Sequence, residues 1–545
     1  MMLLLAALTF QQADLIVTNA RVYTSDVNRP IAEALAVRNG RIAFVGSNRG
    51  ALALAGPRTE RLDLTGRTVI AGMVDAHTHL LGLGQALRTV DLVGTRSYDE
   101  VVARVAERAK SARPGEWIRG RGWDQNDWAD TRFPTHAALS LAVPNNPVYL
   151  TRVDGHAGLV NAKALELAQV TAATPDPTGG RFIRDSAGNP TGVLIDNAQG
   201  VVSRVIPAAS RAQLREQTLA AIAEANRWGL TGIHDAGVGA EGIGIYDELA
   251  REGRYNLRNY VMVRANDSVL DAFMRRGLQK ALHDGRIWIR AIKITADGAL
   301  GSRGAALLDP YSDDAGNTGL ITQPPERIRS VAVRALKAGF QLNVHAIGDR
   351  ANRIVLDQFE AALREVPTAD HRFRIEHAQI LNEQDIPRFA ALDVIPSMQG
   401  SHQTSDMYWV PARLGQARSK GAYAWRSLLS TGVVIPNGSD FPVEAVNPLI
   451  SFHSFVTRQD PENFPAGGWF PEQRTTREEA LLSITLWPAY AAFMENESGS
   501  LTVGKYADFV VVDRDLMPVA PEEILGTRVV RTVLGGRTVY RANSN

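Results

Sequence analysis

The sequence contains no cysteine. This absence excludes disulfide bonds, thiolate nucleophiles, zinc–thiolate sites and iron–sulfur clusters. Any metal that the protein binds must therefore be held by nitrogen and oxygen ligands, such as histidine and carboxylate side chains.

The chain also lacks a charge excess and a long apolar run. Lysine and arginine together number 59 and aspartate and glutamate 58, so the basic excess typical of nucleic-acid or anionic-membrane binding is missing. No apolar run approaches the roughly 18 residues that a membrane-spanning helix requires. We expect no nucleic-acid partner and no membrane partner, whereas a homodimer stays open.

Residues 1–13 are the least certain part of the sequence. The run MMLLLAALTF resembles the apolar part of a secretory signal, but no basic residue precedes it and the cleavage site near Ala13 is poor. An untidy start or a buried first segment explains it equally well. A cytoplasmic and a periplasmic location therefore both remain open.

Eight β-branched runs alternate with helical patterns over most of the chain. Such alternation is typical of parallel strands joined by crossover helices, and eight is the strand number of a (β/α)8 barrel. We expect barrel strands at residues 73–79, 232–237, 259–264, 289–295, 340–346, 373–379, 393–398 and 433–440. Helical patterns occupy residues 329–339, 350–366 and 417–432.

The two ends of the chain and one long gap complete the predicted architecture. Residues 14–66 and 499–545 read as short strands with glycine-rich turns, and we expect the two segments to pair into one small β-sandwich. Residues 67–80 contain the first barrel strand and residues 231–498 the rest of the barrel. The gap at residues 81–230 is too long for one crossover and predicts an insertion that shapes the pocket.

Histidine and aspartate side chains stand where the predicted barrel strands end. His77 and His79 are two residues apart and so share one strand face, while His345, His377 and Asp440 end three further runs. Taken singly, each of the later two histidines is more often a core residue and Asp440 is more often a helix cap. Together, at the carboxyl ends of barrel strands, they predict a site for Zn²⁺, Mn²⁺ or Fe²⁺.

Lys293 lies inside the apolar run IRAIKIT. A lysine there is costly unless it is neutralised or paired. Reaction of the neutral amine with CO₂ would give an anionic carbamate able to bridge two metal ions. A lysine that reaches a carboxylate such as Asp297 is the alternative.

These motifs resemble the amidohydrolase superfamily of metal-dependent hydrolases. VIAGMVDAHTH, the strand lysine, the two later strand-end histidines and the final GSD carry the resemblance. RGWDQNDW, RVDGHAGLVN, KITADGALGSRGAAL, NVHAIGD and GKYADFVVVDRD extend it to the amidohydrolase-3 branch, which includes YtcJ-like proteins and N-substituted formamide deformylases. The resemblance covers nearly the whole chain, but it is weak for the substrate because one such scaffold serves many reactions.

The resemblance implies a set of ligands and roles. His77, His79, carbamylated Lys293 and Asp440 would surround one metal ion, and Lys293, His345 and His377 a second, with zinc expected and the number of ions open. Water activated by the metal would be the nucleophile. Asp440 would carry its proton to the leaving nitrogen, and a metal ion or His345 would polarise the carbonyl.

The insertion and a barrel loop supply the expected substrate contacts. We expect Trp123 and Trp128 to form an aromatic wall around Asp124, and His156 and Arg303 to reach the substrate from loops. Core packing of the tryptophans, a turn cap at His156 and an ion pair of Arg303 with Asp309 or Asp313 are the alternatives. No dedicated basic cluster is visible, so an apolar or aromatic amide is the expected substrate.

The sequence therefore predicts a metal-dependent hydrolase that cleaves a carbon–nitrogen bond. An N-acyl or N-formyl amide is the substrate that we expect first. An esterase, lactonase or deaminase on the same metal centre is a second interpretation. A metal-binding regulator without turnover is a third, although the complete ligand set together with an acid/base aspartate speaks against it.

Overall fold

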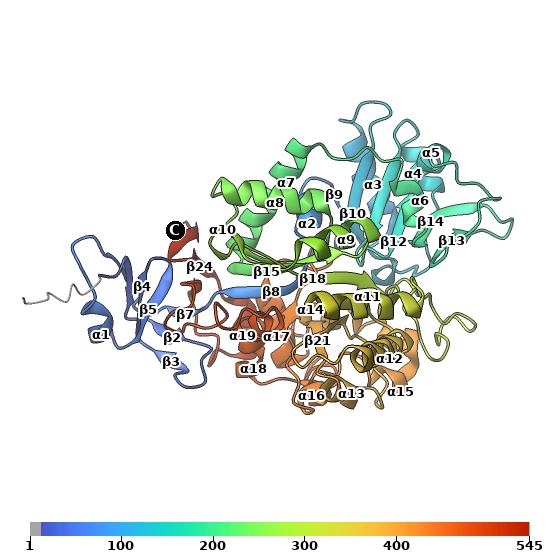
Figure 1. The fold of residues 1–545 in the computed structure, drawn as a ribbon. Helices are drawn as coiled ribbons and strands as arrows, with labels where there is room; N and C mark the ends of the chain where they lie inside the picture. The colour runs from blue at the N-terminus through green and yellow to red at the C-terminus, as the bar shows by residue number, and fades with distance from the viewer. Residues whose placement is uncertain (1–11, 544–545) are drawn as a thin grey trace, which may run out of the picture.

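Eight parallel strands form a nearly closed barrel in the computed structural model, which describes residues 12–543 (Figure 1). The predicted leader lies almost entirely outside the described residues. The barrel strands, in chain order, are β8 (Met73–Thr78), β15 (Leu230–Val238), β16 (Arg258–Arg264), β18 (Ile287–Thr295), β19 (Gln341–Ala346), β20 (Arg374–His377), β21 (Ile395–Gln399) and β22 (Asn437–Gly438). All eight predicted barrel strands are confirmed.

Barrel closure depends on backbone contacts between the first and last strands. The amide of Asp440 donates to the carbonyl of His77 at 2.8 Å, and that of His79 donates to Phe441 at 2.9 Å. Every residue of β8, β19 and β20 is buried, because side chains fill the interior and helices cover the outside. This double burial explains why the strands read as continuous apolar runs.

Helices pack around the barrel and carry ordinary end signals. Ser210 and Gln213 form a capping box at the start of α7, and Gly339 ends α11 with a φ of 73°. Besides the eight barrel strands, this part of the described chain contains one short strand and thirteen α-helices. They are α7 (Arg211–Arg227), α8 (Ala240–Arg251), α9 (Asp267–Arg276), β17 (Gln279–Ala281), α10 (Leu282–Gly285), α11 (Pro325–Ala338), α12 (Asp349–Glu365), α13 (Ile386–Ala391), α14 (Gly400–Asp406), α15 (Val410–Ser419), α16 (Trp425–Leu429), α17 (Pro448–Thr457), α18 (Arg477–Ser483) and α19 (Leu486–Ala491). In the described part of the chain, no helix is long and apolar enough to cross a membrane.

One predicted helix is wrong. The pattern over residues 417–432 predicts a single helix, but α15 ends at Ser419 and α16 begins at Trp425. Between them the amide of Tyr423 bonds to Gln379 at 2.8 Å, and the amide of Leu381 bonds to Gly421 at 2.9 Å. These bonds to the segment after β20 replace the helical ones, so the helix is interrupted.

The predicted β-sandwich of the two chain ends is confirmed. One sheet has the order β5-β4-β1-β6, and the other has the order β25-β24-β23-β7-β2-β3 and so joins both ends of the chain. β7, predicted as part of the barrel segment 67–80, belongs to this second sheet. The bounds are β1 (Leu15–Thr18), β2 (Arg21–Tyr23), β3 (Ile31–Ala32), β4 (Ala34–Arg38), β5 (Arg41–Gly46), α1 (Asn48–Leu52), β6 (Glu60–Asp63), β7 (Thr68–Ala71), β23 (Phe509–Val512), β24 (Val529–Leu534) and β25 (Arg537–Arg541).

The insertion between β8 and β15 builds a sheet of its own, with the order β13-β14-β12-β11-β10-β9. Figure 1 shows it beside the barrel, away from the sandwich. Its elements, with the helix α2 that precedes it, are α2 (Leu80–Ala86), β9 (Val90–Asp91), α3 (Tyr98–Ala109), β10 (Ile118–Trp123), α4 (Ala137–Ala142), β11 (Val148–Arg152), β12 (Ala157–Val160), α5 (Ala162–Leu167), β13 (Gly180–Arg184), β14 (Pro190–Asp196) and α6 (Gln199–Ser203). The insertion has a hydrophobic core separate from that of the barrel.

Candidate metal centre

Six chemically active side chains meet at the carboxyl ends of the barrel strands. They line one cavity although they come from five different strands or the residues just after them. They are His77 of β8, His79 after β8, Lys293 of β18, His345 of β19, His377 of β20 and Asp440 after β22. The carboxyl ends of barrel strands are where enzymes of this fold class build their active sites.

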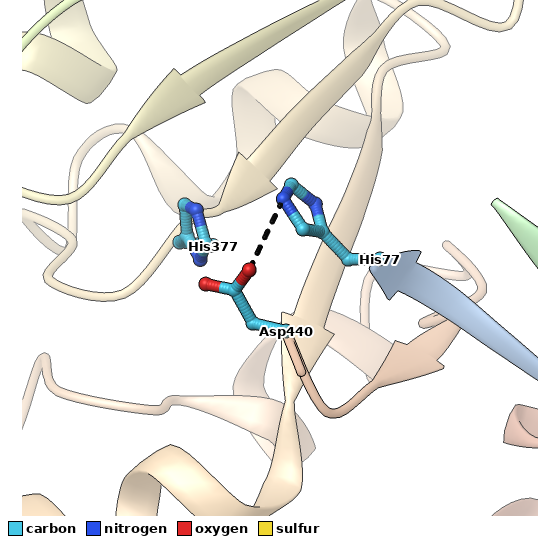
Figure 2. Close-up of side chains that lie close together, drawn as sticks. All are labelled: His77, His377 and Asp440. Atoms are coloured by element: carbon cyan, nitrogen blue, oxygen red, sulfur yellow. Dashed lines mark ion pairs between the residues drawn. The ribbon is translucent and has the colours of Figure 1, made fainter. Parts of the chain in front are cut away.

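Three of the six form a compact group of possible metal ligands. One ligand atom from each of His77, His377 and Asp440 falls within 4.8 Å of the others, and all three side chains are buried (Figure 2). The His77 Nε2 atom is 3.7 Å from Asp440 Oδ1, and the His77 and His377 ring centroids are 4.8 Å apart. This spacing is compact enough for one divalent ion.

The remaining three surround this group. His79 Nε2 is 3.1 Å from Asp440 Oδ1, and Lys293 Nζ is 3.3 Å from His77 Nε2. The ring of His345 lies 4.6 Å from that of His377, centroid to centroid. The alternative pairing of Lys293 with Asp297 does not occur among the ion pairs of residues 12–543.

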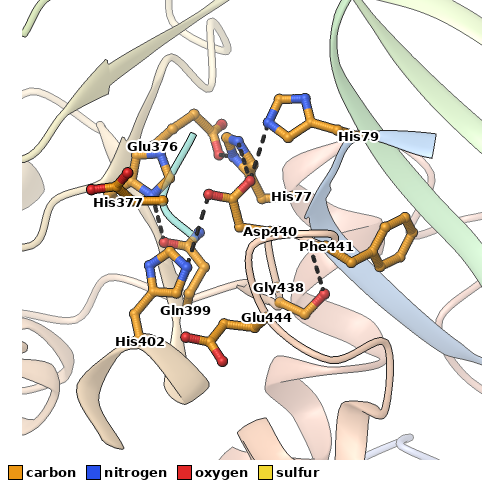
Figure 3. A network of polar contacts seen from close by, with 12 residues as sticks. His77, His79, Glu376, His377, Gln399, His402, Gly438, Asp440, Phe441 and Glu444 are labelled. Carbon is orange, nitrogen blue, oxygen red and sulfur yellow. Dashed lines mark hydrogen bonds and ion pairs between the residues drawn. The ribbon is translucent and has the colours of Figure 1, made fainter. Parts of the chain in front are cut away.

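A second layer of acceptors orients the histidines (Figure 3). His77 Nδ1 lies 2.5 Å from Glu376 Oε2, and His377 Nδ1 lies 2.7 Å from the side-chain oxygen of Gln399. His79 Nδ1 is 3.0 Å from the carbonyl of Ala236. Each acceptor favours the tautomer in which Nδ1–H donates to it, so the lone pair of Nε2 is free for a metal ion, as metal-binding imidazoles require.

Burial and neighbouring charges set the protonation states. Burial and the charge of Lys293 lower the pKa of His77 to about 4, and burial lowers that of His377 well below its usual range. Burial alone would raise the pKa of Asp440, but the facing histidines outweigh it and hold it well below normal. Neutral imidazoles and an ionised carboxylate are the forms that bind a divalent cation.

The donor set fits such an ion. It consists of imidazole nitrogens and carboxylate oxygen, without thiolate, which suits Zn²⁺ and the neighbouring first-row metals. His345 Nε2 is buried and has no hydrogen-bond partner within residues 12–543. A buried polar atom left in this way is costly, and a cation in the cavity would satisfy it.

Two of the candidate ligands have unusual backbone conformations. His377 has a φ of 76° and Asp440 a φ of 59°. Residues other than glycine seldom adopt positive φ, and aspartate tolerates it better than histidine. At both positions the chain leaves the extended strand conformation, and the positive φ directs the side chain into the cavity. Regular strand alternation would not place it there.

The cavity has a volume of about 370 Å³ and is lined by both the barrel and the insertion. A second, more open cavity of about 620 Å³ shares four lining residues with it, namely His79, His156, Lys293 and Thr295. Residues of the insertion, among them Arg119, Arg121 and His156, therefore line the pocket together with residues of the barrel.

One of the predicted substrate residues reaches the site. His156 lines both cavities, and its ring lies 5.0 Å from that of His345. Burial disfavours the charged imidazole of His156, but its bond to Asp196, 2.6 Å long, outweighs burial and raises its pKa to about 9. The Asp196 carboxylate therefore favours the protonated form of His156.

The predicted aromatic wall is wrong. Trp123 is fully buried and Trp128 nearly so, both inside the core of the insertion, and neither lines the cavity. Their indole nitrogens donate to the carbonyls of Leu150 and Thr95. The core alternative for these residues is the one that the structure adopts.

Asp124 and Arg303 also lie away from the cavity lining. Asp124 is buried in an ion pair with Arg152. Arg303 pairs with Asp313 at 2.9 Å, which is one of the alternatives that the sequence left open. Neither side chain has the contacts predicted for it.

Several residues at the site were not predicted. Sequence reasoning misses Glu376 because it directly precedes His377, and adjacent residues of a strand are expected to face opposite sides of the sheet. Gln399 and His402 come from the seventh strand end and the helix after it; His402 Nε2 lies 3.9 Å from Asp440 Oδ2. Arg119 and Arg121 also line the cavity, so the site contains a pair of basic residues that sequence reasoning did not single out. The alternation R-x-R in RGRGW could have indicated them.

Comparison with known proteins places these features in a wider context. The model of the amidohydrolase family matches residues 60–540. "Protein LONG AFTER FAR-RED 3" of Arabidopsis thaliana is 35% identical over 97% of this chain and 92% of its own length. An N-substituted formamide deformylase of Arthrobacter pascens is 31% identical over 97% of this chain and 99% of its own length.

A solved structure agrees with these matches. An uncharacterized metal-dependent hydrolase from Pyrococcus furiosus is 29% identical, with a TM-score of 0.72 over 93% of this chain and 99% of its own. The similarity thus extends over the sandwich, the barrel and the insertion together.

Proposed function

Because the chain belongs to the amidohydrolase family and is thereby a hydrolase of carbon–nitrogen bonds, we propose that it hydrolyses a non-peptide amide of a small molecule, of the N-acyl or N-formyl kind. The observation that carries this proposal is the convergence of His77, His377 and Asp440 within 4.8 Å at the barrel mouth. The formamide deformylase named above supports the N-formyl variant by analogy.

We assign the primary divalent ion, Zn²⁺ in our proposal, to His77, His377 and Asp440, with His79 and His345 as further nitrogen donors. A bound divalent ion supplies acidification of water and polarisation of a carbonyl oxygen. Lys293 is the candidate carbamate: burial lowers the pKa of its amine, which favours the neutral form that adds to CO₂ with loss of one proton. If Lys293 is modified in this way, its carbamate could bridge the first ion and a second one.

The side chains of the site divide the remaining work. Asp440 accepts a proton from the water that adds to the carbonyl carbon and delivers it to the nitrogen as the C–N bond breaks, giving an acid and an amine. The ring of His345 lies next to those of His377 and His156. In our proposal, His345 and His156 stabilise negative charge on the carbonyl oxygen. Glu376 and Gln399 hold the imidazoles in place.

The proposal does not keep the expected apolar or aromatic substrate. That expectation depended on the lack of a dedicated cluster of basic residues and was in keeping with an aromatic wall of two tryptophans. Both tryptophans are buried in the insertion, and two arginines line the cavity.

Metal analysis and a small substrate panel test the proposal. The panel consists of N-formyl and N-acetyl p-nitroanilides and p-nitrophenyl acetate, assayed with purified protein before and after chelation and after addition of Zn²⁺. We expect bound metal, amide hydrolysis lost on chelation, and recovery with Zn²⁺. Ester cleavage alone would favour an esterase, and bound metal without turnover of any substrate would favour a regulator; either result contradicts the proposal.

A double variant tests the site itself. His77→Ala combined with His79→Ala removes two nitrogen donors from one strand end, and we expect loss of metal and activity with an unchanged circular dichroism spectrum. Retention of stoichiometric metal would overturn the ligand assignment.

A further inference from the structure

Two arginines of the insertion form one wall of the cavity. Arg119 and Arg121 are two residues apart on β10, so their side chains share one face of the sheet. Thr151 of β11 is aligned with Arg121 in the parallel register, and all three residues line the cavity that holds the candidate ligands. The insertion therefore directs two guanidinium groups and a hydroxyl toward the space in front of the metal centre.

Neither guanidinium forms an ion pair with a carboxylate among the described residues, although Asp440 and Asp154 attract that of Arg121 from beyond contact distance. Arg121 donates from Nε to the carbonyl of Pro442 at 3.1 Å and from Nη2 to that of Val153 at 2.7 Å. Arg119 lies against the neutral side-chain amide of Gln85. Within residues 12–543, neither arginine has an aspartate or glutamate oxygen within ion-pair distance.

Most of the fully buried arginines of this chain have a carboxylate partner, although Arg458 bonds only to the carbonyls of Trp469 and Tyr423. Arg152, Arg258 and Arg374 each pair with at least one carboxylate. The two carboxylates that line the cavity are engaged elsewhere, since Asp154 pairs with Arg152 and Asp440 faces the histidines. A guanidinium that leaves bulk water with only neutral partners is costly, so an anionic group brought by a ligand would be bound strongly here.

We propose that Arg119 and Arg121 bind a carboxylate of the substrate, so that the substrates are amides carrying a free carboxylate, of the N-acyl or N-formyl amino acid class. This inference rests on the proposed function for the reaction, although the binding of the anion does not. A guanidinium fork matches a planar carboxylate. A monoanion is favoured over a phosphate dianion because Asp154 and Asp440 also line the cavity and repel negative charge.

The position of this subsite links recognition to the reaction. Pro442, whose carbonyl accepts from Arg121, lies two residues after Asp440. A substrate carboxylate held by the two arginines would therefore lie beside the segment that carries the proposed proton carrier. The amide would extend from there toward the histidines across the same cavity.

Matched acid and neutral ligands test the proposal. The probes are racemic N-acetylphenylalanine and its carboxamide, compared by kcat/KM and by isothermal titration calorimetry with the protein as purified. We expect the acid to be preferred by at least about tenfold. Hydrogen bonds to charged groups are worth about 10- to 100-fold each, so Arg119→Met should reduce the preference for the acid over the carboxamide by about that factor.

Two further variants keep the test decisive. Arg121→Lys retains the positive charge but loses the forked guanidinium. It should weaken binding of the acid less than Arg121→Met does. Arg132→Met serves as a control, because Arg132 belongs to the insertion but is exposed and pairs with Asp130; it should leave the preference unchanged.

The outcomes separate this inference from the proposed function. Charge-dependent binding without amide turnover would support the subsite and contradict the hydrolase proposal. Amide turnover with equal use of acid and carboxamide, or an equal loss of both in the arginine variants, would overturn the subsite. Competition by inorganic phosphate without binding of the acid would overturn the assignment to a carboxylate.

Discussion

At the scale of single residues, the partner of each Nδ1 atom distinguishes the histidines from one another. His77 has a charged partner, Glu376, which in turn contacts Arg374 at 2.7 Å, whereas His377 has the neutral amide of Gln399. A carboxylate partner raises the basicity of an imidazole more than an amide does. His77 is therefore the histidine whose metal affinity depends most on its second layer.

Glu376→Gln tests this dependence. The substitution keeps the size and an acceptor oxygen but removes the charge, and we expect zinc affinity to fall about 10- to 100-fold. Competition with a fluorescent chelator measures the affinity. Arg374 loses its partner as well, so thermal unfolding is measured in parallel. Gln399→Glu places a negative charge beside His377 and should not weaken zinc binding. If both variants lower the zinc affinity equally, the proposed difference between His77 and His377 is wrong.

Asp440→Asn separates proton transfer from binding. Asparagine tolerates the positive φ of this position and keeps one ligand oxygen, but it cannot carry the proton. We expect metal content to be largely retained and kcat to fall by about 10² to 10⁴. Asp393→Asn is the control, because Asp393 also has a positive φ, 50°, but is exposed. A near wild-type kcat for Asp440→Asn would remove Asp440 from the proposed mechanism.

Residues at predicted strand ends could be placed from the sequence, whereas residues that depend on register or on the insertion could not. His77, His345 and Asp440 follow apolar runs, so their convergence follows from the barrel alone. Glu376 and its neighbour His377 face the same site only because His377 leaves the regular strand conformation. Arg119 and Arg121 reach the cavity through a sheet whose strands were not predicted one by one.

At the scale of elements, strands buried on both faces are the easiest to predict. Their apolar runs need no alternation, and all eight runs occur as barrel strands. The helix expected over residues 417–432 failed for the opposite reason. Its pattern is locally helical, but the segment near Gly421 and Tyr423 exchanges backbone hydrogen bonds with residues 379 and 381, a tertiary effect that no local pattern contains.

The shortest barrel strand, β22, depends on a close approach to β8. A Cβ atom at Gly438 would lie 2.6 Å from the amide nitrogen of His77 and 2.8 Å from Asp75 Oδ1. Gly438→Ala should therefore push β22 and Asp440 away from His77, lowering stability by about 1–3 kcal/mol and weakening metal binding. Denaturant unfolding and metal titration measure the two effects.

Gly200→Ala is the matched control for this substitution. Its Cβ would meet no atom within 4 Å and it lies in α6, so stability should be unchanged or slightly increased. If the two variants have the same stability and metal affinity, the close approach of β22 to β8 is not needed for either property, and the prediction is wrong.

At the scale of the whole molecule, a buried ion pair ties the barrel to the C-terminal half of the sandwich. Arg258 of β16 and Asp508, which precedes β23, are both buried; the Nη2–Oδ1 bond is 2.8 Å long. The Tyr506 ring lies 3.5 Å from the guanidinium carbon. The amide of Gly72, just before β8, also donates to the carbonyl of Asp508, so both chain ends meet the barrel at this point.

Arg258→Met tests the strength of this tie. Removal of one partner leaves Asp508 buried and unpaired, which typically costs about 3–5 kcal/mol, and thermal or denaturant unfolding should show a loss of that order. Lys110→Met, which removes an ion pair that is 73% exposed on both sides, should change stability by less than about 1 kcal/mol. Similar small losses in both variants would contradict a structural role for the buried pair.

The composite sandwich also has a consequence for synthesis on the ribosome. β7 needs β23 as its neighbour, and Ala71 pairs with Phe509, roughly 440 residues later in the chain. At about 5–20 residues per second, the N-terminal strands wait between roughly 20 and 90 s for their partner. During that time the edge of β7 stays open to other strands. A prematurely terminated chain never closes that edge, so it remains recognisable as incomplete to chaperones and proteases.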